Sequence, residues 1–238
     1  MGVHKVKLIR KETVATGTMA FHFEKPDGFQ FIAGQYAVYI LIDPPQTDSE
    51  GNERCFTIAS APFEDDLVFI TRMRDTAFKR VMKDMPIGTL VKIDGPNGKL
   101  TLKNDKTPVV FLTGGIGVTP ALSIINQAVH DHNNQKITLF YSNSNSDSAV
   151  DMEKFYEMAK QDSNFTFVPT MTDSSFGDYH GETGVINIEM LRKYINNLLQ
   201  PNFYITGPPA MVKSLHQILT DNGINKHHIF TEDFEGYN

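Results

Sequence analysis

Short runs of alternating apolar and polar residues, each ended by a turn signal, fill the first hundred positions of the chain. This pattern predicts strands, because successive side chains of a strand point to opposite faces. The predicted strands cover residues 5–10, 18–23, 36–42, 56–59, 67–72 and 90–93. One helical pattern interrupts them at 76–85 and ends before Pro86. Short strands punctuated by glycine and proline indicate an antiparallel β-barrel over residues 1–102.

After residue 107 the pattern changes to apolar runs that alternate with segments of helical periodicity. The predicted strands are 109–113, 136–142, 165–171, 202–206 and 228–230. The predicted helices are 119–132, 149–161, 188–199 and 209–222. This alternation predicts an α/β doubly wound parallel sheet over residues 103–238, in which ligands bind at the carboxyl ends of the strands.

Composition narrows the class of protein. The chain has 238 residues, of which 40% are hydrophobic and 21% charged, and its net charge of -6 argues against a nucleic-acid binder. No apolar run is long enough for membrane insertion and the first residues lack a signal-peptide core, so a cytoplasmic location is expected. The single cysteine, Cys55, excludes an internal disulfide and an iron–sulfur cluster held by this chain's own cysteines. The histidines show no ligand spacing, and no metal is predicted.

The strongest local signal is the stretch Thr113-Gly114-Gly115-Ile116-Gly117-Val118-Thr119-Pro120, which follows the apolar run 109–112. A strand that breaks into glycines and then opens a helix predicts a phosphate-binding turn, because backbone N–H groups and the helix dipole favour an anion. Thr119 is expected to cap the helix, with Pro120 in its first turn. A second turn, Gly207-Pro208-Pro209-Ala210-Met211, repeats this logic after a later strand. Ordinary strand-to-helix turns are the alternative for both.

Two further motifs complete an ordered set: Arg54-Cys55-Phe56-Thr57 in the barrel half, and the terminal Glu232-Asp233-Phe234-Glu235-Gly236-Tyr237. With the two glycine turns between them, they make the chain resemble the ferredoxin–NADP reductase superfamily over essentially its whole length. The resemblance implies that the barrel half binds FAD, which it favours over FMN, and that the second half binds NADH or NADPH. It implies hydride transfer from the nicotinamide to flavin N5, and then electron transfer to an acceptor.

The resemblance also implies roles in the barrel motif. Alternation places Arg54 and Phe56 on one face of a strand and Cys55 and Thr57 on the other. By resemblance Arg54 pairs with the flavin pyrophosphate, Phe56 packs on the isoalloxazine ring, and the Thr57 hydroxyl bonds near N5. An ordinary barrel strand is the alternative.

A second flavin-phosphate element is implied at a helix start. It comprises Arg72, Arg74, Thr76, Ala77, Phe78 and Lys79. Many relatives have Gly-x-x-Ser here, so the side-chain contacts differ, although a threonine cap, free N–H groups and a lysine suit a phosphate.

The remaining implied roles lie near the chemistry. Thr206 stands where relatives often have a cysteine that faces the nicotinamide. Phe234 resembles an aromatic residue that returns over the flavin, and Glu232 is a candidate proton-relay or orienting carboxylate; plain packing of the tail is the alternative.

The donor and the acceptor are inferred from charge. Ser142 and Asn143 begin a segment, 142–147, that contains no Arg or Lys to meet a 2′-phosphate, and Val185 stands where some relatives have arginine, so NADH is favoured. An acidic ferredoxin or flavodoxin, or an oxygenase component, is the expected protein partner, because basic residues gather in two segments. They are Lys5, Lys7, Arg10, Lys11, Arg72, Arg74, Lys79, Arg80 and Lys83.

Three alternatives remain open. The basic groups could be solvated faces or phosphate contacts. The chain could instead reduce free flavin, ferric chelates or quinones. It could also be a non-catalytic nucleotide-binding subunit, since this architecture does not require turnover.

Overall fold

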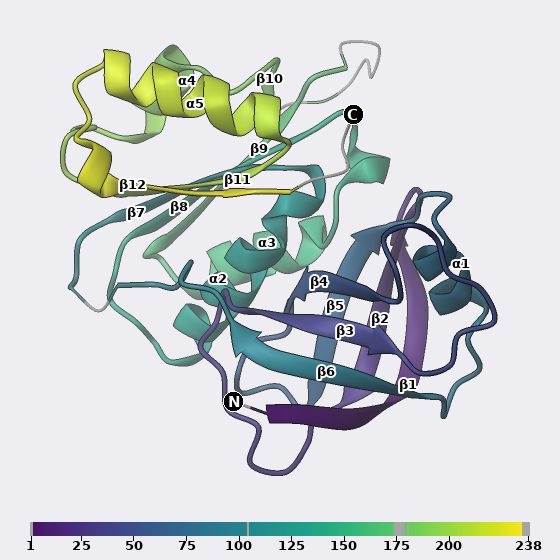
Figure 1. Ribbon diagram of the computed structural model, residues 1–238. Helices are drawn as coiled ribbons and strands as arrows, with labels where there is room; N and C mark the ends of the chain where they lie inside the picture. The colour runs from purple at the N-terminus through teal and green to yellow at the C-terminus, as the bar shows by residue number, and fades with distance from the viewer. Residues whose placement is uncertain (1, 104, 174–178, 180, 235–238) are drawn as a thin grey trace.

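A computed structural model describes residues 2–103, 105–173, 179 and 181–234. Two six-stranded sheets lie one above the other, joined by a short connection (Figure 1). The predicted division after residue 102 falls in this connection, between β6 and β7. No helix in the described part of the chain is long and apolar enough to cross a membrane.

The first sheet is antiparallel, with the strand order β4-β3-β6-β1-β2-β5. Its strands are β1 Gly2–Ala15, β2 Thr18–Glu24, β3 Tyr36–Leu41, β4 Glu53–Thr57, β5 Asp66–Arg72 and β6 Leu90–Asn97. The two edge strands approach each other, because Ala59 N–H donates to the Val68 carbonyl at 2.7 Å and Phe56 stacks on Phe69 at 4.2 Å. The sheet therefore curls into the predicted barrel. Helix α1, Ala77–Asp84, packs its apolar face against the barrel core.

The second sheet is parallel throughout, with the order β10-β9-β8-β7-β11-β12. Its strands are β7 Val109–Gly114, β8 Ile137–Asn143, β9 Phe165–Met171, β10 Glu182–Thr183, β11 Asn202–Gly207 and β12 Ile229–Asp233. The helices are α2 Thr119–His130, α3 Met152–Gln161, α4 Ile188–Tyr194 and α5 Pro209–Asp221, with 3₁₀ turns η1 Gly115–Val118, η2 Ser146–Ser148 and η3 Lys226–His228. Helices α4 and α5 cover one face and α2 and α3 the other, so the predicted doubly wound sheet is confirmed (Figure 1).

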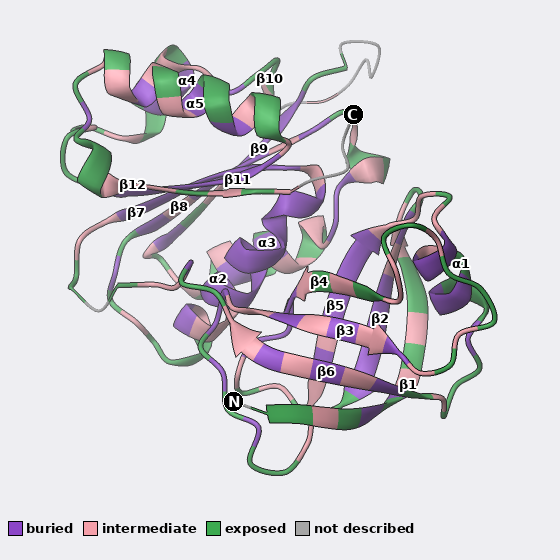
Figure 2. Cartoon of the chain, in the orientation of Figure 1, coloured by how far each residue is buried: buried purple, intermediate pink, exposed green. Residues whose placement is uncertain are grey.

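Burial explains the strand patterns. The central strands β7 and β11 are buried at every position, as continuous apolar runs of a parallel sheet require, and Figure 2 shows them in purple. The exposed edge of the barrel alternates instead. The face that carries α2 packs on the barrel through small residues, and buried Ser123 donates to the Ser60 carbonyl at 2.7 Å. The two sheets thus share one packed interface.

Several predicted boundaries were wrong. Strand β1 is longer than predicted because irregular register at Leu8/Arg10 and Thr13/Ala15 lets it bend and continue to Ala15. Strand β4 begins earlier than predicted, since its polar residues pair along the edge of the sheet with β3. Helix α4 ends at Tyr194, short of the predicted 199, where Ile195 adopts an extended conformation ahead of Pro201. The two-residue β10 has no apolar pattern that could have predicted it.

Candidate functional site

A cleft of about 660 Å³ opens between the barrel and the carboxyl edge of the parallel sheet. Its wall contains residues from β4, β5, the start of α1, the η1–α2 turn and the segment that begins in β12. Ten of the predicted site residues line it: Arg54, Phe56, Thr57, Arg72, Arg74, Thr76, Lys79, Thr119, Glu232 and Phe234. Segments separated by more than a hundred residues in sequence therefore meet in one concave site of the size that ligand pockets have.

The strand motif places its aromatic residue against the barrel core. Phe56 and Arg54 both contact Phe78, at 5.8 and 5.4 Å respectively, so they share one face of β4 as alternation predicted. The Phe56 ring also stacks on Phe69 with an interplanar angle of 5°. One side of the ring is therefore fixed by the core, while the half-buried remainder lines the cleft. Thr57 is buried at the cleft wall.

Positive side chains crowd the barrel side of the cleft. Burial, together with the charges of Arg74 and Arg54, lowers the pKa of Lys79 to about 8. Its ammonium group donates to the carbonyl of Arg72 at 2.8 Å. The Nε atom of Arg72 is buried and bonds no partner in the described part of the chain. Cations that repel one another and an unmet buried donor are what an anion would stabilise.

Helix α1 begins at this same place. Thr76 is its N-cap, and the Thr76 hydroxyl accepts the N–H of Lys79 at 3.4 Å. Ala77 and Phe78, also predicted to touch the cofactor, are buried, and Phe78 packs into the barrel core. The helix start thus contributes backbone and cap to the cleft more than side chains.

The guanidinium of Arg54 is held by the protein itself. Its Nη2 atom donates to Asp48 Oδ1 at 3.0 Å and to Glu50 Oε2 at 2.9 Å. Its Nη1 atom donates to the carbonyls of Glu50 at 2.9 Å and Glu53 at 2.6 Å. The sequence motif identified Arg54 but not these two carboxylates, because the contact depends on the fold of the loop between β3 and β4.

The two glycine turns touch each other at the carboxyl edge of the parallel sheet. A Cβ added to Gly117 would lie 2.6 Å from both Gly207 Cα and the Thr206 carbonyl oxygen. Thr206 is fully buried, and its hydroxyl donates to the Gly117 carbonyl at 2.6 Å. These glycines are therefore required for close backbone approach. Gly115 differs, with φ +52° and open space around its Cβ position.

The prediction that Thr119 caps α2 was wrong. The η1 turn precedes the helix, Val118 occupies the cap position, and the Thr119 hydroxyl donates to the Ile116 carbonyl at 3.1 Å. A 3₁₀ turn leads directly into α2, so the first helical N–H groups are shared between two consecutive turns. Pro120 lies in the first turn of α2 as expected.

The other predicted dinucleotide residues gather along the same edge without lining the cleft. In the strand register Gly114 pairs with Ser142 and Thr113 pairs with Thr206. The hydroxyl of buried Thr113 donates to the Phe140 carbonyl at 3.2 Å. Met211 and Pro208 pack where a Cβ on Gly114 would lie. The backbone of the turns, more than these side chains, is available to a ligand.

Asn143, at the end of β8, has a different environment. Its side chain is buried close to the Tyr141 hydroxyl, and neither amide atom makes a hydrogen bond of normal geometry to the residues that the structure describes. Buried amides are normally paired. An unpaired one at the carboxyl edge of the parallel sheet is suited to a polar ligand.

The chain's C-terminal strand completes the cleft. Glu232 pairs in register with Thr206, and burial raises the pKa of its carboxyl group. The N–H of Phe234 donates to the Gly207 carbonyl at 3.0 Å, which ties this segment to the second glycine turn. Residues 235–238, the rest of the tail motif, lie outside the described residues.

Sequence reasoning missed part of the cleft wall. The additional lining residues are Tyr36, Glu50, Cys55, Ile70, Thr71, Ile116 and Asp233. Cys55, Ile116 and Asp233 stand within recognised motifs, so their proximity could have been inferred. The others lie on β3, on β5 and in the β3–β4 loop, and no sequence motif marks them.

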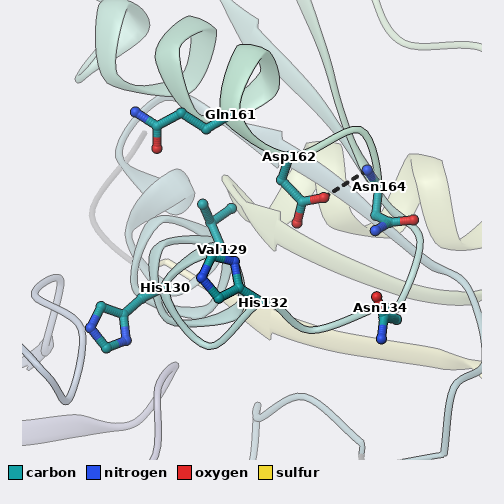
Figure 3. Close-up of a pocket in the computed structure, with 7 residues that line it drawn as sticks. All are labelled: Val129, His130, His132, Asn134, Gln161, Asp162 and Asn164. Atoms are coloured by element: carbon teal, nitrogen blue, oxygen red, sulfur yellow. Dashed lines mark hydrogen bonds between the residues drawn. The ribbon is translucent and has the colours of Figure 1, made fainter.

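A second cavity of about 520 Å³ lies at the opposite edge of the parallel sheet, beyond the ends of α2 and α3 (Figure 3). Its lining residues are Val129, His130, His132, Asn134, Gln161, Asp162 and Asn164. Asp162 accepts the backbone N–H of Asn164 at 2.8 Å, and His130 points away from the other side chains (Figure 3). None of the predicted site residues lies here.

Known proteins resemble this chain in sequence and in structure. The family model described as "Oxidoreductase NAD-binding domain" matches residues 111–217. The Na(+)-translocating NADH-quinone reductase of Neisseria gonorrhoeae has a subunit that is 29% identical over 199 residues, 77% of this chain and 49% of that protein. The reductase component of propane 2-monooxygenase of Mycolicibacterium goodii is 25% identical over 218 residues, 88% of this chain and 61% of that protein. The chain spans about half the length of the first curated relatives it matches.

Solved structures share the fold over nearly the whole chain. A ferredoxin NADP+ reductase from Neisseria gonorrhoeae, solved with bound FAD and NADP, has a TM-score of 0.80 at 22% identity, covering 97% of this chain and 98% of that one. A cytochrome P450 reductase from Amycolatopsis has a TM-score of 0.83 at 21% identity, covering 98% of this chain and 70% of that one.

Proposed function

We propose that this chain is an FAD-dependent NAD(P)H oxidoreductase of the ferredoxin–NADP reductase-like superfamily, a proposal supported by the NAD-binding family model over residues 111–217 and by the similar reductases. The observation that carries the proposal is the single cleft in which the cationic barrel wall meets the glycine-turn edge of the parallel sheet. We assign residues 1–102 to FAD binding and residues 103–238 to dinucleotide binding. The cytoplasm is the proposed location, supported by the single free cysteine.

The barrel wall fits the requirements of FAD. Arg54, Arg74 and Lys79 supply positive charge for a pyrophosphate, and the buried Nε of Arg72 supplies an unmet donor. Phe56 offers a ring that is fixed from behind by Phe69. A bound FAD would supply the redox chemistry, taking a hydride from NAD(P)H and passing electrons to the acceptor.

Two side chains are proposed to act near the reacting atoms. The Thr57 hydroxyl, at the wall between the two sheets, would orient the flavin ring. Glu232 would hold a proton or orient the nicotinamide, and burial raises the pKa of its carboxyl group, which favours the protonated form. Thr206 would act indirectly, because its hydroxyl is already engaged by Gly117.

NADH is the proposed donor. Segment 142–147 contains no cation, and the first one after it, Lys154, forms an ion pair with Glu64 at 3.6 Å. A 2′-phosphate would find no free counter-charge there. The unpaired amide of Asn143 is instead suited to ribose hydroxyl groups.

A second candidate concerns the acceptor. Several of the basic residues on which a protein partner was predicted are neutralised internally: Lys7 bonds Glu24 at 2.8 Å, Arg10 bonds Glu12 at 2.8 Å, and Arg80 bonds Asp75. Pairing weakens the field that would steer an acidic carrier protein. Reduction of a small acceptor such as a quinone, ferric chelate or free flavin is therefore proposed beside transfer to a carrier protein.

The test is an anaerobic titration of the FAD-loaded protein, followed by absorbance. Bleaching of the flavin band at lower concentrations of NADH than of NADPH is expected. Preferential bleaching by NADPH would overturn the donor assignment alone. If FAD binds and neither nucleotide bleaches it, the non-catalytic alternative replaces the enzyme. Protein without FAD is the control for nucleotide absorbance.

A further inference from the structure

The loop between β3 and β4 brings the carboxylate of Asp48 against Arg54, one of the cations that line the cleft. Asp48 Oδ2 accepts the backbone N–H of Ala77, the first residue of α1, at 2.9 Å. Asp48 Oδ1 accepts Arg54 Nη2 at 3.0 Å. One anionic group therefore bridges a helix N-terminus and a guanidinium, the two kinds of donor that hold a phosphate in proteins.

This loop is held in place at several points. It runs beside α1 in Figure 1, where Arg80 Nη2 donates to Gln46 at 3.1 Å. Asn52 donates to the Leu41 carbonyl at 2.8 Å, and the Gly51 N–H donates to the Asp48 carbonyl at 3.0 Å. Asp48 therefore occupies its position as part of a folded turn.

The Asp48 carboxyl group is ionised in this position. Desolvation raises its pKa, but the N–H groups of Ala77 and Glu50 and the guanidinium of Arg54 together lower it below the usual value. Glu50 adds a second carboxylate on Arg54 Nη2 at 2.9 Å. The two carboxylates therefore bring to Arg54 and the start of α1 the negative charge that a diphosphate would bring.

A phosphate and Asp48 cannot use these donors at the same time. Both Nη atoms of Arg54 are already engaged, by the two carboxylates and by the carbonyls of Glu50 and Glu53. Like charges that share one donor set also repel. Two of the donors proposed for a flavin phosphate, Arg54 and the Ala77 N–H, are thus already occupied by the chain's own carboxylates.

We propose that Asp48 is an internal phosphate mimic, which must be displaced from Arg54 and the α1 N-terminus before the FAD pyrophosphate can bind. This inference rests on the proposed function and adds regulation to the same site. The loop 46–52 then controls flavin affinity, and FAD behaves as an exchangeable ligand whose apparent affinity is reduced by the closed fraction of the loop.

The Asp48→Asn substitution tests the mimic. The amide oxygen can still accept the Ala77 N–H, so the turn is retained while the competing charge is lost. Titration of the FAD-free protein with FAD, followed by flavin fluorescence, should show an affinity about tenfold higher than in the original protein. The association rate should rise as well, because the site no longer has to open.

Asp75→Asn is the matched control. Asp75 is an exposed acid close to the start of α1 that pairs with Arg80, whereas Asp48 contacts Arg54 and the Ala77 N–H. Its neutralisation should leave the FAD affinity nearly unchanged. An equal gain in both variants would reduce the effect to general electrostatics and overturn the proposal. A loss of FAD affinity in Asp48→Asn would overturn it too, because Asp48 would then be an organiser of Arg54.

Hydrogen exchange of the original protein gives a second readout that does not depend on a variant. The Glu50 N–H donates to Asp48 Oδ1 at 3.0 Å, so FAD binding should accelerate amide exchange in segment 48–51. Slower exchange on FAD binding would overturn the mimic and leave the oxidoreductase proposal intact. Failure of both the original protein and Asp48→Asn to bind FAD would overturn both proposals together.

Discussion

The two sides of the cleft differ in structure: backbone contacts between glycine turns dominate one, and charged side chains dominate the other. On the parallel-sheet side, two glycine turns pack backbone against backbone next to the lining residues Ile116 and Thr119. Gly117 approaches Gly207 and the carbonyl of Thr206 so closely that no side chain fits between them. The barrel wall is charged side chains, among which Arg54 is already paired with Asp48 and Glu50. The glycine-turn side is therefore fixed by backbone packing, whereas the barrel side carries a cation that is already paired with the chain's own carboxylates. Substitutions on the glycine-turn side are therefore expected to act mainly on protein stability, and substitutions on the barrel side mainly on ligand affinity.

Substitution at the glycine contact should have the largest effect. In Gly117→Ala the new Cβ would meet backbone atoms at 2.6 Å, which cannot move without separating the two turns. We expect the free energy of unfolding to fall by about 2–3 kcal/mol, with loss of NADH-dependent flavin reduction. Urea unfolding and stopped-flow reduction measure the two quantities.

Gly115→Ala is the comparison variant, since its Cβ position is open and only φ +52° is unfavourable. It should cost about 1 kcal/mol. If Gly117→Ala costs no more than this, close packing of the turns is not what the parallel-sheet wall depends on.

The barrel wall should respond in the opposite way. Arg54→Gln removes a cation and leaves the Asp48 and Glu50 carboxylates without their partner, so FAD affinity should fall about a hundredfold and stability should fall as well. Fluorescence titration measures the affinity. In the double variant Arg54→Gln/Asp48→Asn, FAD affinity should be about tenfold higher than in Arg54→Gln alone, because the uncompensated charge of Asp48 is removed.

Arg192→Gln is the control for loss of an arginine, since Arg192 lies on α4 and bonds Asn222. Equal FAD affinity in Arg54→Gln and Arg192→Gln would contradict the assignment of Arg54 to the flavin phosphate.

The smallest expected effect is a pH dependence from Lys79. Its pKa is lowered to about 8, first by burial and then by Arg74 and Arg54. As the pH rises past this value the free protein loses the charge, so FAD affinity should fall by about three- to fivefold between about pH 7 and about pH 9. Lys79→Met should flatten the profile. Lys83→Met, on the same helix, should keep it, and an identical flattening there would assign the effect to α1 as a whole.

Much of the fold could be predicted, and the reasons are local. The apolar run before Gly114 predicts a buried strand, and the proline at the start of α5 predicts a helix start. Each signal depends only on a few neighbouring residues, so the order of strands, turns and helices could be predicted. Boundaries failed where distant partners extend an element, as when β1 continues past Arg10 by pairing with β2. The predicted cap of α2 was wrong because a 3₁₀ turn, η1, leads directly into the helix. Such turns are frequent at helix ends, and the sequence did not distinguish this one from the first turn of the helix.

The candidate site divides in the same way. The motifs identified ten of the lining residues, including residues as distant as Arg54 and Glu232. Their roles toward FAD and NAD(P)H stay predictions. The motifs did not reveal that the Thr206 hydroxyl is bonded to Gly117, or that Phe56 rests on Phe69. Both contacts join segments that are adjacent only after the sheets have formed.

The sequence by itself determined the two kinds of sheet, the position of the glycine turns and the presence of a cationic segment at the start of α1. These depend on periodicity, on backbone freedom and on charge, which are properties of short segments. Only the tertiary structure decided what the cations face. Asp48 is 29 residues from Ala77 along the chain and 2.9 Å from its N–H in space. That contact exists because the barrel fixes where the loop and α1 lie, and no local pattern contains that information.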